Sequence, residues 1–337
     1  MIGGEGAGTS APMLIFRHYT GVPEAGRGAV IALGNFDGVH RGHQAVIGTA
    51  RELARQMDSK LGVLSFEPHP RSFFQPDQPP FRLSPFRIKV RHMESFGVDL
   101  LYALRFDAKL AALSAEDFVS DILVAGFGVR HVVIGYDFKF GAGRRGDGDF
   151  LIQQGEINEF GVSVVQPARD VVDEVYSSSL IRDYLRNGQP QRAAALFGHL
   201  WEIEGRVLHG DQRGRTIGFP TANVDLGEYM RPAFGVYAVR AGVPQDGRVV
   251  WYDGVANLGL RPTVGGERLL LEVHLFDYSG DLYGQHLRVA LVDFLRPERK
   301  FSDFNALKAQ IDDDARQARQ LLLARSIGAG DFVGEDI

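Results

Sequence analysis

The first half of the chain alternates short apolar runs with helical patterns. The apolar runs cover residues 29–33, 61–66, 98–104, 131–136 and 162–167. Helical patterns fall between them, near 85–96 and from a predicted capping box at Ser114 and Asp117 to about Ala125. Consecutive strands that are joined by helices become parallel, and the helices cover both faces of the sheet. We therefore expect an open α/β domain with a parallel sheet over residues 14–185.

From about residue 200 the pattern changes to strand-like runs that are separated by turns. These runs cover residues 201–208, 235–243, 248–257, 268–277 and 286–295. Several short strands with Gly, Pro and Asp turns between them favour a small antiparallel β-barrel or a sandwich. A C-terminal helix carries Phe304, Leu307 and Ile311 on one apolar face. We expect this second domain to cover residues 201–325, after a linker at 186–200.

Composition limits the kind of protein. The 337 residues suffice for about two domains, and a net charge of −5 argues against a large nucleic-acid-binding face. Without cysteine the chain forms neither disulfides nor a Cys-ligated zinc site. No apolar run approaches the roughly 20 residues of a membrane span, and the start of the chain lacks the pattern of a secretory signal. We expect a cytoplasmic protein without nucleic-acid or membrane partners, and the sequence leaves the oligomeric state open.

The stretch "GNFDGVHRGH" (34–43) joins the first predicted strand to the next helix. In an open parallel sheet, ligands bind beyond the carboxyl ends of the strands, and the N-terminus of a helix attracts anions. Three glycines let the backbone approach a phosphate closely, and His40 and His43 can donate hydrogen bonds to its oxygens. The stretch therefore predicts a phosphate-binding loop.

Two other interpretations of these histidines are weaker. A zinc site would need more ligands, but the chain has no cysteine and no third histidine or carboxylate is placed obviously nearby. A pair of core-packed histidines is disfavoured by a stretch this rich in glycine and polar residues.

Three further loops follow predicted strands of the same sheet. "FEPHP" carries His69, "IGYDFKFGAGRRGDGD" carries Asp137, and "SSSLIRDYL" carries Arg182 one turn into a helix that Ser177 could cap. Taken singly, each is an ordinary loop or helix cap. Because the carboxyl ends of parallel strands meet at one edge, the loops together predict one site.

Two features of the second half carry chemistry. "GRVLHGDQRGRTIGFPTANV" ends with the Thr221 hydroxyl and the Asn223 amide oxygen, which suit Mg²⁺, although the segment could also be a turn before a strand. Glu272 lies in the middle of a predicted strand, where a carboxylate needs a partner or a function. It is either paired in a salt bridge with Arg261 or Arg288, or it is a general base for a hydroxyl.

These motifs resemble a known family. "GNFDGVHRGH", with its HxGH pattern, resembles the nucleotidyltransferase signature, and with "FEPHP", "IGYDFKFG" and "SSSLIR" it resembles the Rossmann-like FMN adenylyltransferase module of bacterial bifunctional riboflavin kinase/FAD synthetases. The resemblance implies that His40 and His43 are catalytic and bind the ATP phosphates. The family often has Asn at position 137 and Thr at position 179, and both replacements here keep an oxygen ligand. The remaining residues that it implies at this site are Gly34, Phe36, Asp37, Gly42, His69, Asp137, Ser178, Ser179 and Arg182.

The second half resembles the riboflavin kinase module of the same family, a small antiparallel barrel. The resemblance rests on "HGDQRGRTIGFPTAN", "PAFGVYAV", "VANLGLRPTVGG" and "LEVHLFDYSGDLYG". It implies that Thr221 and Asn223 hold Mg²⁺ with ATP and that Glu272 takes the proton of the flavin ribityl hydroxyl. The ATP- and flavin-binding residues that it implies are Gly205, His209, Gly210, Arg215, Gly218, Pro220, Asn257 and Arg261.

The resemblance implies two successive reactions, phosphorylation of riboflavin to FMN and adenylylation of FMN to FAD. Riboflavin, FMN and ATP are then substrates, Mg²⁺ is the metal, and no permanently bound redox cofactor is required. One alternative is an adenylyltransferase for another small phosphate, with a barrel that only binds ligand. Another is a flavin-sensing binding protein. Glu272 argues against the first alternative, and the intact HxGH pattern argues against the second.

Overall fold

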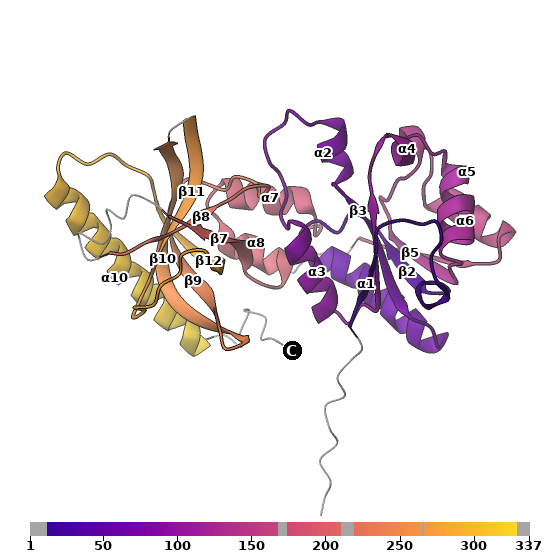
Figure 1. Cartoon of the computed structure of the whole chain (residues 1–337), viewed down its shortest axis with the longest axis horizontal. Coiled ribbons are helices and arrows are strands. Elements are labelled where there is room, and N and C mark those ends of the chain that lie inside the picture. Colours follow the sequence, from indigo (N-terminus) through magenta and orange to yellow (C-terminus); the bar gives the residue numbers. More distant parts are fainter. Residues whose placement is uncertain (1–11, 168–173, 210–218, 264–265, 329–337) are drawn as a thin grey trace, which may run out of the picture. The chain divides into compact units, whose positions relative to one another are not determined.

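The computed structural model describes residues 12–167, 174–209, 219–263 and 266–328 (Figure 1). The chain divides into two compact units, described separately below. The α/β unit comprises Met1–Gln78 and Phe86–Val175, and the barrel unit comprises Pro79–Pro85 and Tyr176–Ile337. The division falls at residue 175, a helix lies within 186–200, and the predicted domain bounds stay a prediction.

Six parallel strands form the sheet of the α/β unit, in the order β1-β4-β3-β2-β5-β6. Their bounds are β1 Leu14–Phe16, β2 Val30–Leu33, β3 Leu61–Glu67, β4 Leu100–Arg105, β5 His131–Gly135 and β6 Gly161–Val165. The predicted parallel sheet is confirmed. The sequence misses β1, because three residues are too few to show a pattern.

Helices cover both faces of this sheet, as the alternation predicts. Ile31 and Leu33 of β2 face a core formed with α4, α5, η2 and α6, whereas Val30 and Ala32 face α1 and α3. The helices are α1 Arg41–Gln56, α2 Pro70–Phe74, α3 Phe86–Ser95, α4 Ala108–Ala111, α5 Ala115–Asp117, the π-helix η2 Phe118–Gly126 and α6 Gly148–Ile157, with short 3₁₀ turns η1 Glu24–Gly26 and η3 Ala142–Arg144.

The predicted capping box is confirmed at the start of α5. Ser114 Oγ accepts a hydrogen bond from Asp117 N at 2.9 Å and donates one to Asp117 Oδ2 at 2.8 Å. The helix that it starts is α-helical for one turn only and then continues as the π-helix η2.

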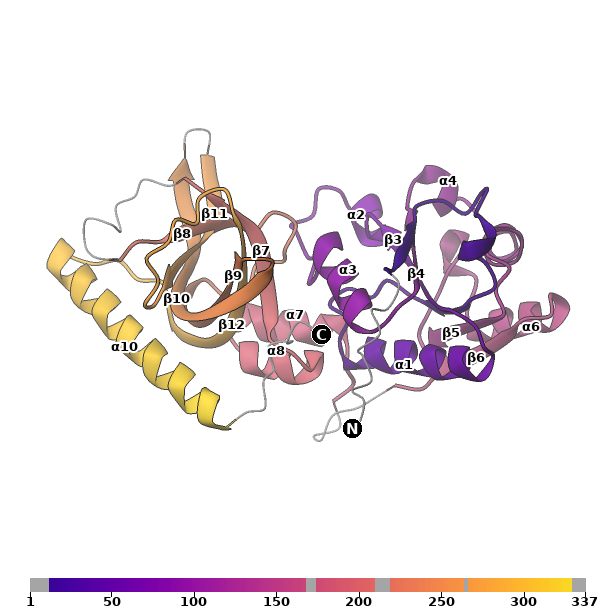
Figure 2. The same ribbon diagram turned by 60° about the horizontal axis from the view of Figure 1, so that its bottom comes forward.

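In the barrel unit, six antiparallel strands close a barrel in the order β10-β11-β8-β7-β12-β9, and Figure 2 shows the ring. The bounds are β7 Trp201–Leu208, β8 Ala222–Asp225, β9 Gly235–Gln245, β10 Arg248–Thr263, β11 Gly266–Leu275 and β12 His286–Pro297. Closure decides between the barrel and the sandwich that the sequence leaves open. The sequence misses β8, which has only four residues.

The described residues of the barrel unit also form the helices α7 Ser178–Arg186, α8 Pro190–Phe197 and α10 Phe304–Gly328. The pair α7 and α8 pack together, and α8 contacts β7 and β12. Ala318 and Leu322 of α10 are fully buried against the barrel, and Asp314 of α10 accepts a hydrogen bond from Arg296 at 2.7 Å. Phe304, predicted to lie on the apolar face of this helix, is 58% exposed, because the core contacts come from later turns.

The segment 79–85 belongs to the barrel unit although the α/β sequence surrounds it. Trp201 Nε1 donates to Leu83 O and Arg182 Nε donates to Phe81 O, both at 2.8 Å. The sequence pattern gives no sign of this arrangement, because the contacts join residues about a hundred positions apart.

Candidate active sites

The loop at 34–40 lies where the order of the α/β sheet reverses. The chain runs from β2 to β3 and β4 on one side and later to β5 on the other side of β2. Such a reversal opens a crevice at the carboxyl ends of the strands, where ligands bind. The loop then enters α1, so the predicted placement between a strand and a helix is confirmed.

Two histidines meet at the start of α1. His40 is the N-cap residue, and its Nδ1 accepts a hydrogen bond from His43 N at 3.4 Å. The two rings are stacked with centroids 3.7 Å apart, and the Phe36 ring meets His43 edge-on at 5.2 Å. His40 is only 5% exposed, so one of the pair is packed despite the surrounding glycines. Both rings nevertheless lie at a helix N-terminus, the position at which an anion is stabilised.

The turn before His40 is built from unusual backbone conformations. Phe36, Gly38 and Val39 have φ values of 50°, 88° and 41°. Gly34 leaves room for the Phe36 ring, because a Cβ there would lie 3.2 Å from it. Phe36 and Asp37 are buried, and Gly42 lies in the first turn of α1.

Sequence reasoning misses Lys89, which lies under this turn. Its side chain is fully buried, and Nζ donates to Asn35 O at 3.0 Å, to Ser65 Oγ at 3.0 Å and to Glu67 Oε1 at 2.9 Å. The available signal was a lysine beside the apolar Ile88 within a predicted amphipathic helix.

The loops with His69 and Asp137 follow the two strands that flank β2. His69 is the N-cap residue of α2, and its Nδ1 accepts a hydrogen bond from Arg71 N at 3.0 Å. Asp137 is exposed in the turn after β5. The sheet therefore brings the loops of His40, His69 and Asp137 to one edge, as predicted.

Ser178, Ser179 and Arg182 belong to α7 of the barrel unit. Ser177 caps this helix, since its side chain accepts a hydrogen bond from Leu180 N at 3.2 Å. Arg182 is 8% exposed and lies over the Phe81 ring, 5.3 Å from its centroid. The expected contacts of these residues with a phosphate stay predictions.

In the barrel unit, three polar residues lie side by side on neighbouring strands. Asn223 of β8 and Asn257 of β10 are the register partners of Glu272 on either side. Residues that are directly opposite in antiparallel strands share a face. Leu271 and Val273 are fully buried on the opposite face, so the predicted alternation of this strand is confirmed.

Glu272 is held by Arg261. Arg261 donates from Nη2 and Nε to Glu272 Oε2, at 2.6 and 3.0 Å, and from Nη1 to Glu298 Oε1 at 3.1 Å. Asn257 Nδ2 donates to the same Glu298 oxygen at 3.2 Å. Burial disfavours the charge of Arg261, but the hydrogen bonds and charges of the two carboxylates raise its pKa above the ordinary value. The salt-bridge interpretation is thus correct for Arg261, whereas Arg288 pairs with Glu202 at 2.9 Å.

This network opens into a cavity of about 380 Å³. Its lining includes the polar residues Glu272, Asn257 and Arg261 and the apolar residues Leu307 and Ile311 of α10. Leu307 and Ile311 of the predicted apolar stripe therefore line a cavity, and Phe304 does not.

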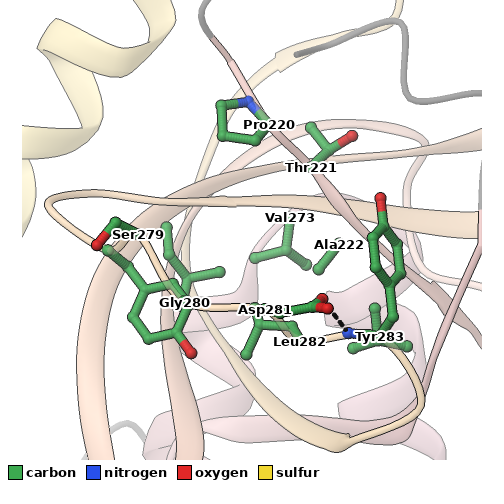
Figure 3. A pocket seen from close by; sticks show the side chains of 12 residues that line it. Pro220, Thr221, Ala222, Val273, Ser279, Gly280, Asp281, Leu282 and Tyr283 are labelled. Atoms are coloured by element: carbon green, nitrogen blue, oxygen red, sulfur yellow. Dashed lines mark hydrogen bonds between the residues drawn. The ribbon is translucent and has the colours of Figure 1, made fainter.

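Thr221 also lines a second cavity, of about 410 Å³ (Figure 3). Its apolar wall includes Ala222 and Val273, and the loop 278–283 closes it. In that loop Tyr283 N donates to Asp281 Oδ1 at 3.0 Å, the dashed line of Figure 3. A half-apolar space beside a hydroxyl suits a nucleotide base and its phosphates.

Comparison of the sequence with known protein families and proteins shows the family of the chain. A family model described as FAD synthetase matches residues 22–179, and one described as riboflavin kinase matches residues 197–322. The chain is 44% identical over 295 residues to the bifunctional riboflavin kinase/FMN adenylyltransferase of Escherichia coli K12, covering 87% of this chain and 92% of that protein. The chain belongs to the bifunctional riboflavin kinase/FMN adenylyltransferase family. Similar proteins of the same name occur in Pseudomonas fluorescens, at 43% identity over 88% of this chain and 93% of that protein, and in Bacillus subtilis, at 40% over 86% and 91%.

A solved structure has the same fold. The crystal structure described as a macrolide-efflux protein from Streptococcus pneumoniae covers 91% of this chain and 98% of its own, with a TM-score of 0.80 and 29% identity. In the described part of the chain, no helix is long and apolar enough to cross a membrane.

Membership of the bifunctional family decides between the functions that the sequence left open. The chain is an ATP-dependent transferase with riboflavin kinase and FMN adenylyltransferase activities, and its substrates are riboflavin, FMN and ATP. The two alternatives, adenylylation of a different phosphate and flavin sensing without catalysis, are set aside.

The remaining predicted kinase residues fall into three groups. His209 stacks on Tyr283 with ring centroids 4.2 Å apart, and Pro220 lines the second cavity while its carbonyl accepts a hydrogen bond from His274 Nδ1 at 2.9 Å. Gly205 serves packing, because a Cβ there would lie 2.7 Å from Val224. Gly210, Arg215 and Gly218 lie outside the described residues.

Proposed function

We propose that each unit performs one of the two reactions of the family. The barrel unit phosphorylates riboflavin, and the α/β unit adenylylates the FMN that results. The observation that carries this division is the pair of family matches, since the riboflavin kinase model covers the barrel and the FAD synthetase model covers nearly all of the α/β sheet.

In the kinase reaction, Glu272 acts as the general base. Its carboxylate accepts the proton of the terminal ribityl hydroxyl while that oxygen attacks the γ-phosphorus of ATP, and ADP leaves. Arg261 donates two hydrogen bonds to a single oxygen, Oε2, of Glu272. This contact fixes the carboxylate and leaves Oε1 for the hydroxyl. Asn257, beside Glu272 in the register, contacts the same ribityl chain.

The two cavities divide the substrates between them. The cavity beside Glu272 takes the flavin, because its apolar wall of Phe301, Leu307 and Ile311 suits a planar aromatic ring system. The cavity of Figure 3 takes ATP. Thr221 lines both, so it lies where the γ-phosphate and the ribityl hydroxyl must meet.

Thr221 and Asn223 would hold Mg²⁺ together with the ATP phosphates. They lie two residues apart in an extended segment, so their oxygens share a face. A hydroxyl and an amide oxygen suit a cation that keeps several waters and phosphate oxygens as ligands. Among the described residues, no group of three or more His, Asp or Glu side chains could bind a metal without substrate. When bound, the ion would neutralise charge on the transferred phosphoryl group.

In the adenylyl transfer, a phosphate oxygen of FMN attacks the α-phosphorus of ATP, and pyrophosphate leaves. His40 and His43 stabilise the charge that develops on the phosphates, at the positive end of the α1 dipole. A phosphate is already an anionic nucleophile, so no covalent enzyme intermediate is required. His69 and Asp137 contribute from the neighbouring loops.

An aromatic cluster beside His69 suits the flavin ring of FMN. Phe73 and Phe74 of α2 meet Phe106 edge-to-face, with centroids 5.5 and 5.7 Å away, and Phe74 is 64% exposed. Exposed aromatic side chains next to a polar site commonly bind planar ligands.

We place both reactions in the cytoplasm, where ATP is abundant, without nucleic-acid partners and without a resident redox cofactor. Separation of the soluble and membrane fractions of cells, followed by detection of the chain, tests the location.

The division of labour is tested with purified protein that is given either riboflavin or FMN, each with Mg-ATP, followed by chromatographic separation of the flavins. Riboflavin should give FMN and then FAD, and FMN should give FAD directly. Removal of Mg²⁺ with a chelator should stop FMN formation. Failure to form either product from riboflavin would contradict the proposal.

A further inference from the structure

We propose that Lys89 is a positioning residue for adenylyl transfer, which holds the loops of His40 and His69 in one arrangement. The proposal rests on the function proposed above, in which these two loops bind the phosphates of ATP. Lys89 itself touches no substrate, since its side chain is fully buried.

The surroundings of Lys89 are unusual for a lysine. A buried ammonium group costs free energy unless it is paired and hydrogen-bonded, and a methionine would fill the same space in a core. Here the ammonium group donates to Asn35 O, Ser65 Oγ and Glu67 Oε1, so polar partners surround it. Asn35 lies two residues beyond the end of β2, Ser65 lies within β3, and Glu67 is the last residue of β3.

The hydrogen bond from Lys89 to Asn35 O affects the position of His40. Asn35 O also accepts a hydrogen bond from Ser65 Oγ at 3.1 Å, so two donors hold this carbonyl. The next residue, Phe36, has a left-handed backbone, as does Val39 immediately before His40. Such conformations persist in residues with side chains only where the surroundings fix them. The hydrogen bonds to Asn35 O therefore fix the turn that places His40 at the start of α1.

The ion pair of Lys89 with Glu67 affects the position of His69. Glu67 ends β3 two residues before His69, and its backbone carbonyl accepts a hydrogen bond from Phe106 N at 3.0 Å. Its side chain is only 12% exposed and pairs with Lys89. Because β2 and β3 are neighbours in the sheet, a single ammonium group joins the two loops that leave them.

The test uses the full chain with Lys89→Met, which keeps the length of the side chain and removes the charge. We expect kcat for FAD formation from FMN to fall by about 10²-fold, since displacements near 1 Å at a reacting centre cost that much. FMN formation from riboflavin, measured in the same preparation, should be unchanged. Lys89→Arg, which keeps a charged donor, should recover part of the activity. The matched control is Ile88→Ala in the same helix, where a buried apolar group is removed. It should lower the melting temperature and leave kcat unchanged.

A cycle with the histidines separates positioning from a general effect on folding. Lys89→Met should reduce FAD formation far less in a His40→Ala background than in the wild type. Lys89 acts by positioning His40, and in that background the His40 side chain is already missing. Should Lys89→Met fail to fold, Glu67→Gln takes its place, with an expected loss of about 10-fold in kcat.

Two results would overturn the inference: a lower melting temperature with unchanged kcat in Lys89→Met or its replacement, or full additivity with His40→Ala. A wild-type rate of FAD formation in His40→Ala alone would instead contradict the function proposed for the histidine loop, so the two failures are distinguishable.

Discussion

The two candidate sites of this chain are built in opposite ways. In the α/β unit the polar groups lie in loops beyond the strand ends, and a turn with left-handed backbone places His40 at the N-terminus of α1. In the barrel unit Asn223 and Glu272 lie within strands, and a side-chain ion pair with Arg261 fixes the carboxylate. In the proposed function both sites handle phosphate, the first with histidines at a helix N-terminus and the second with a carboxylate and oxygen ligands.

The difference shows what each site tolerates. A loop site depends on backbone conformation, so its residues act together and single losses are shared among several donors. A strand site depends on individual side chains in a rigid register, so a single base is hard to replace. We therefore expect the largest single-residue effect in the barrel and smaller single-residue effects in the loop.

The largest effect should come from Glu272→Gln. The amide keeps the shape of the side chain and cannot take the ribityl proton, so FMN formation should fall by about 10²–10⁴-fold. Conversion of added FMN to FAD should stay at the wild-type rate, which is measured separately by chromatography. Equal losses in both reactions would contradict the separation of the sites.

His43→Ala should give the opposite result with a smaller loss. It removes a charge-stabilising donor at the start of α1 and the ring that stacks on His40 at 3.7 Å. FAD formation should fall by about 10²–10³-fold, since loss of one preorganised donor has that effect. Riboflavin phosphorylation is the control, and a comparable fall there would show that the two sites are coupled.

The same contrast explains what could be predicted from the sequence. The histidine loop was predictable, because its strand, turn and helix are contiguous and glycines mark the turn. For Thr221 and Asn223 the residue types left a Mg²⁺ site and a turn open, since β8 is too short to show alternation, and the family resemblance favoured the Mg²⁺ site. The alignment of Asn257 with Glu272 depends on register between strands, which local patterns do not determine.

Two features of the structure were not predicted from the sequence, for the same physical reason. The contacts of segment 79–85 with Trp201 and Arg182 join distant parts of the chain, so no local pattern marks them. The role of Lys89 was not predicted, because a lysine in a surface helix normally lies in solvent. Only the tertiary fold shows that its side chain is buried.

Arg261→Lys should have an intermediate effect on the barrel reaction. A lysine cannot reproduce two parallel hydrogen bonds to Glu272 and a third to Glu298, so the carboxylate gains freedom to turn. FMN formation should fall by about 10-fold, less than in Glu272→Gln, with the loss mainly in kcat. In the double variant with Glu272→Gln the second change should add little. A loss seen only in KM for riboflavin would instead assign Arg261 to flavin binding.

The smallest effect should be a loss of stability in mild acid that both units share. Burial lowers the pKa of His131 in β5 below the ordinary value of 6.5. Burial also lowers the pKa of His199 in the barrel unit, where the hydrogen bond to Leu200 O and the charge of Glu202 oppose the shift in part. Both folded forms therefore favour the neutral ring. Their stability is fully present above the unfolded pKa and declines as pH falls from there through the lowered folded pKa.

Thermal unfolding between about pH 7.5 and pH 5 measures this loss. His131→Gln and His199→Gln should each flatten the decline, because glutamine does not titrate. Ring contacts are removed in both variants, so the slope against pH is compared rather than the melting temperature itself. If neither variant changes the slope, the acid sensitivity does not arise from these histidines. If only His131→Gln changes the slope, the hydrogen bond to Leu200 O and the charge of Glu202 offset the effect of burial on the pKa of His199 completely. The two units then differ in their response to acid, as they differ in the construction of their sites.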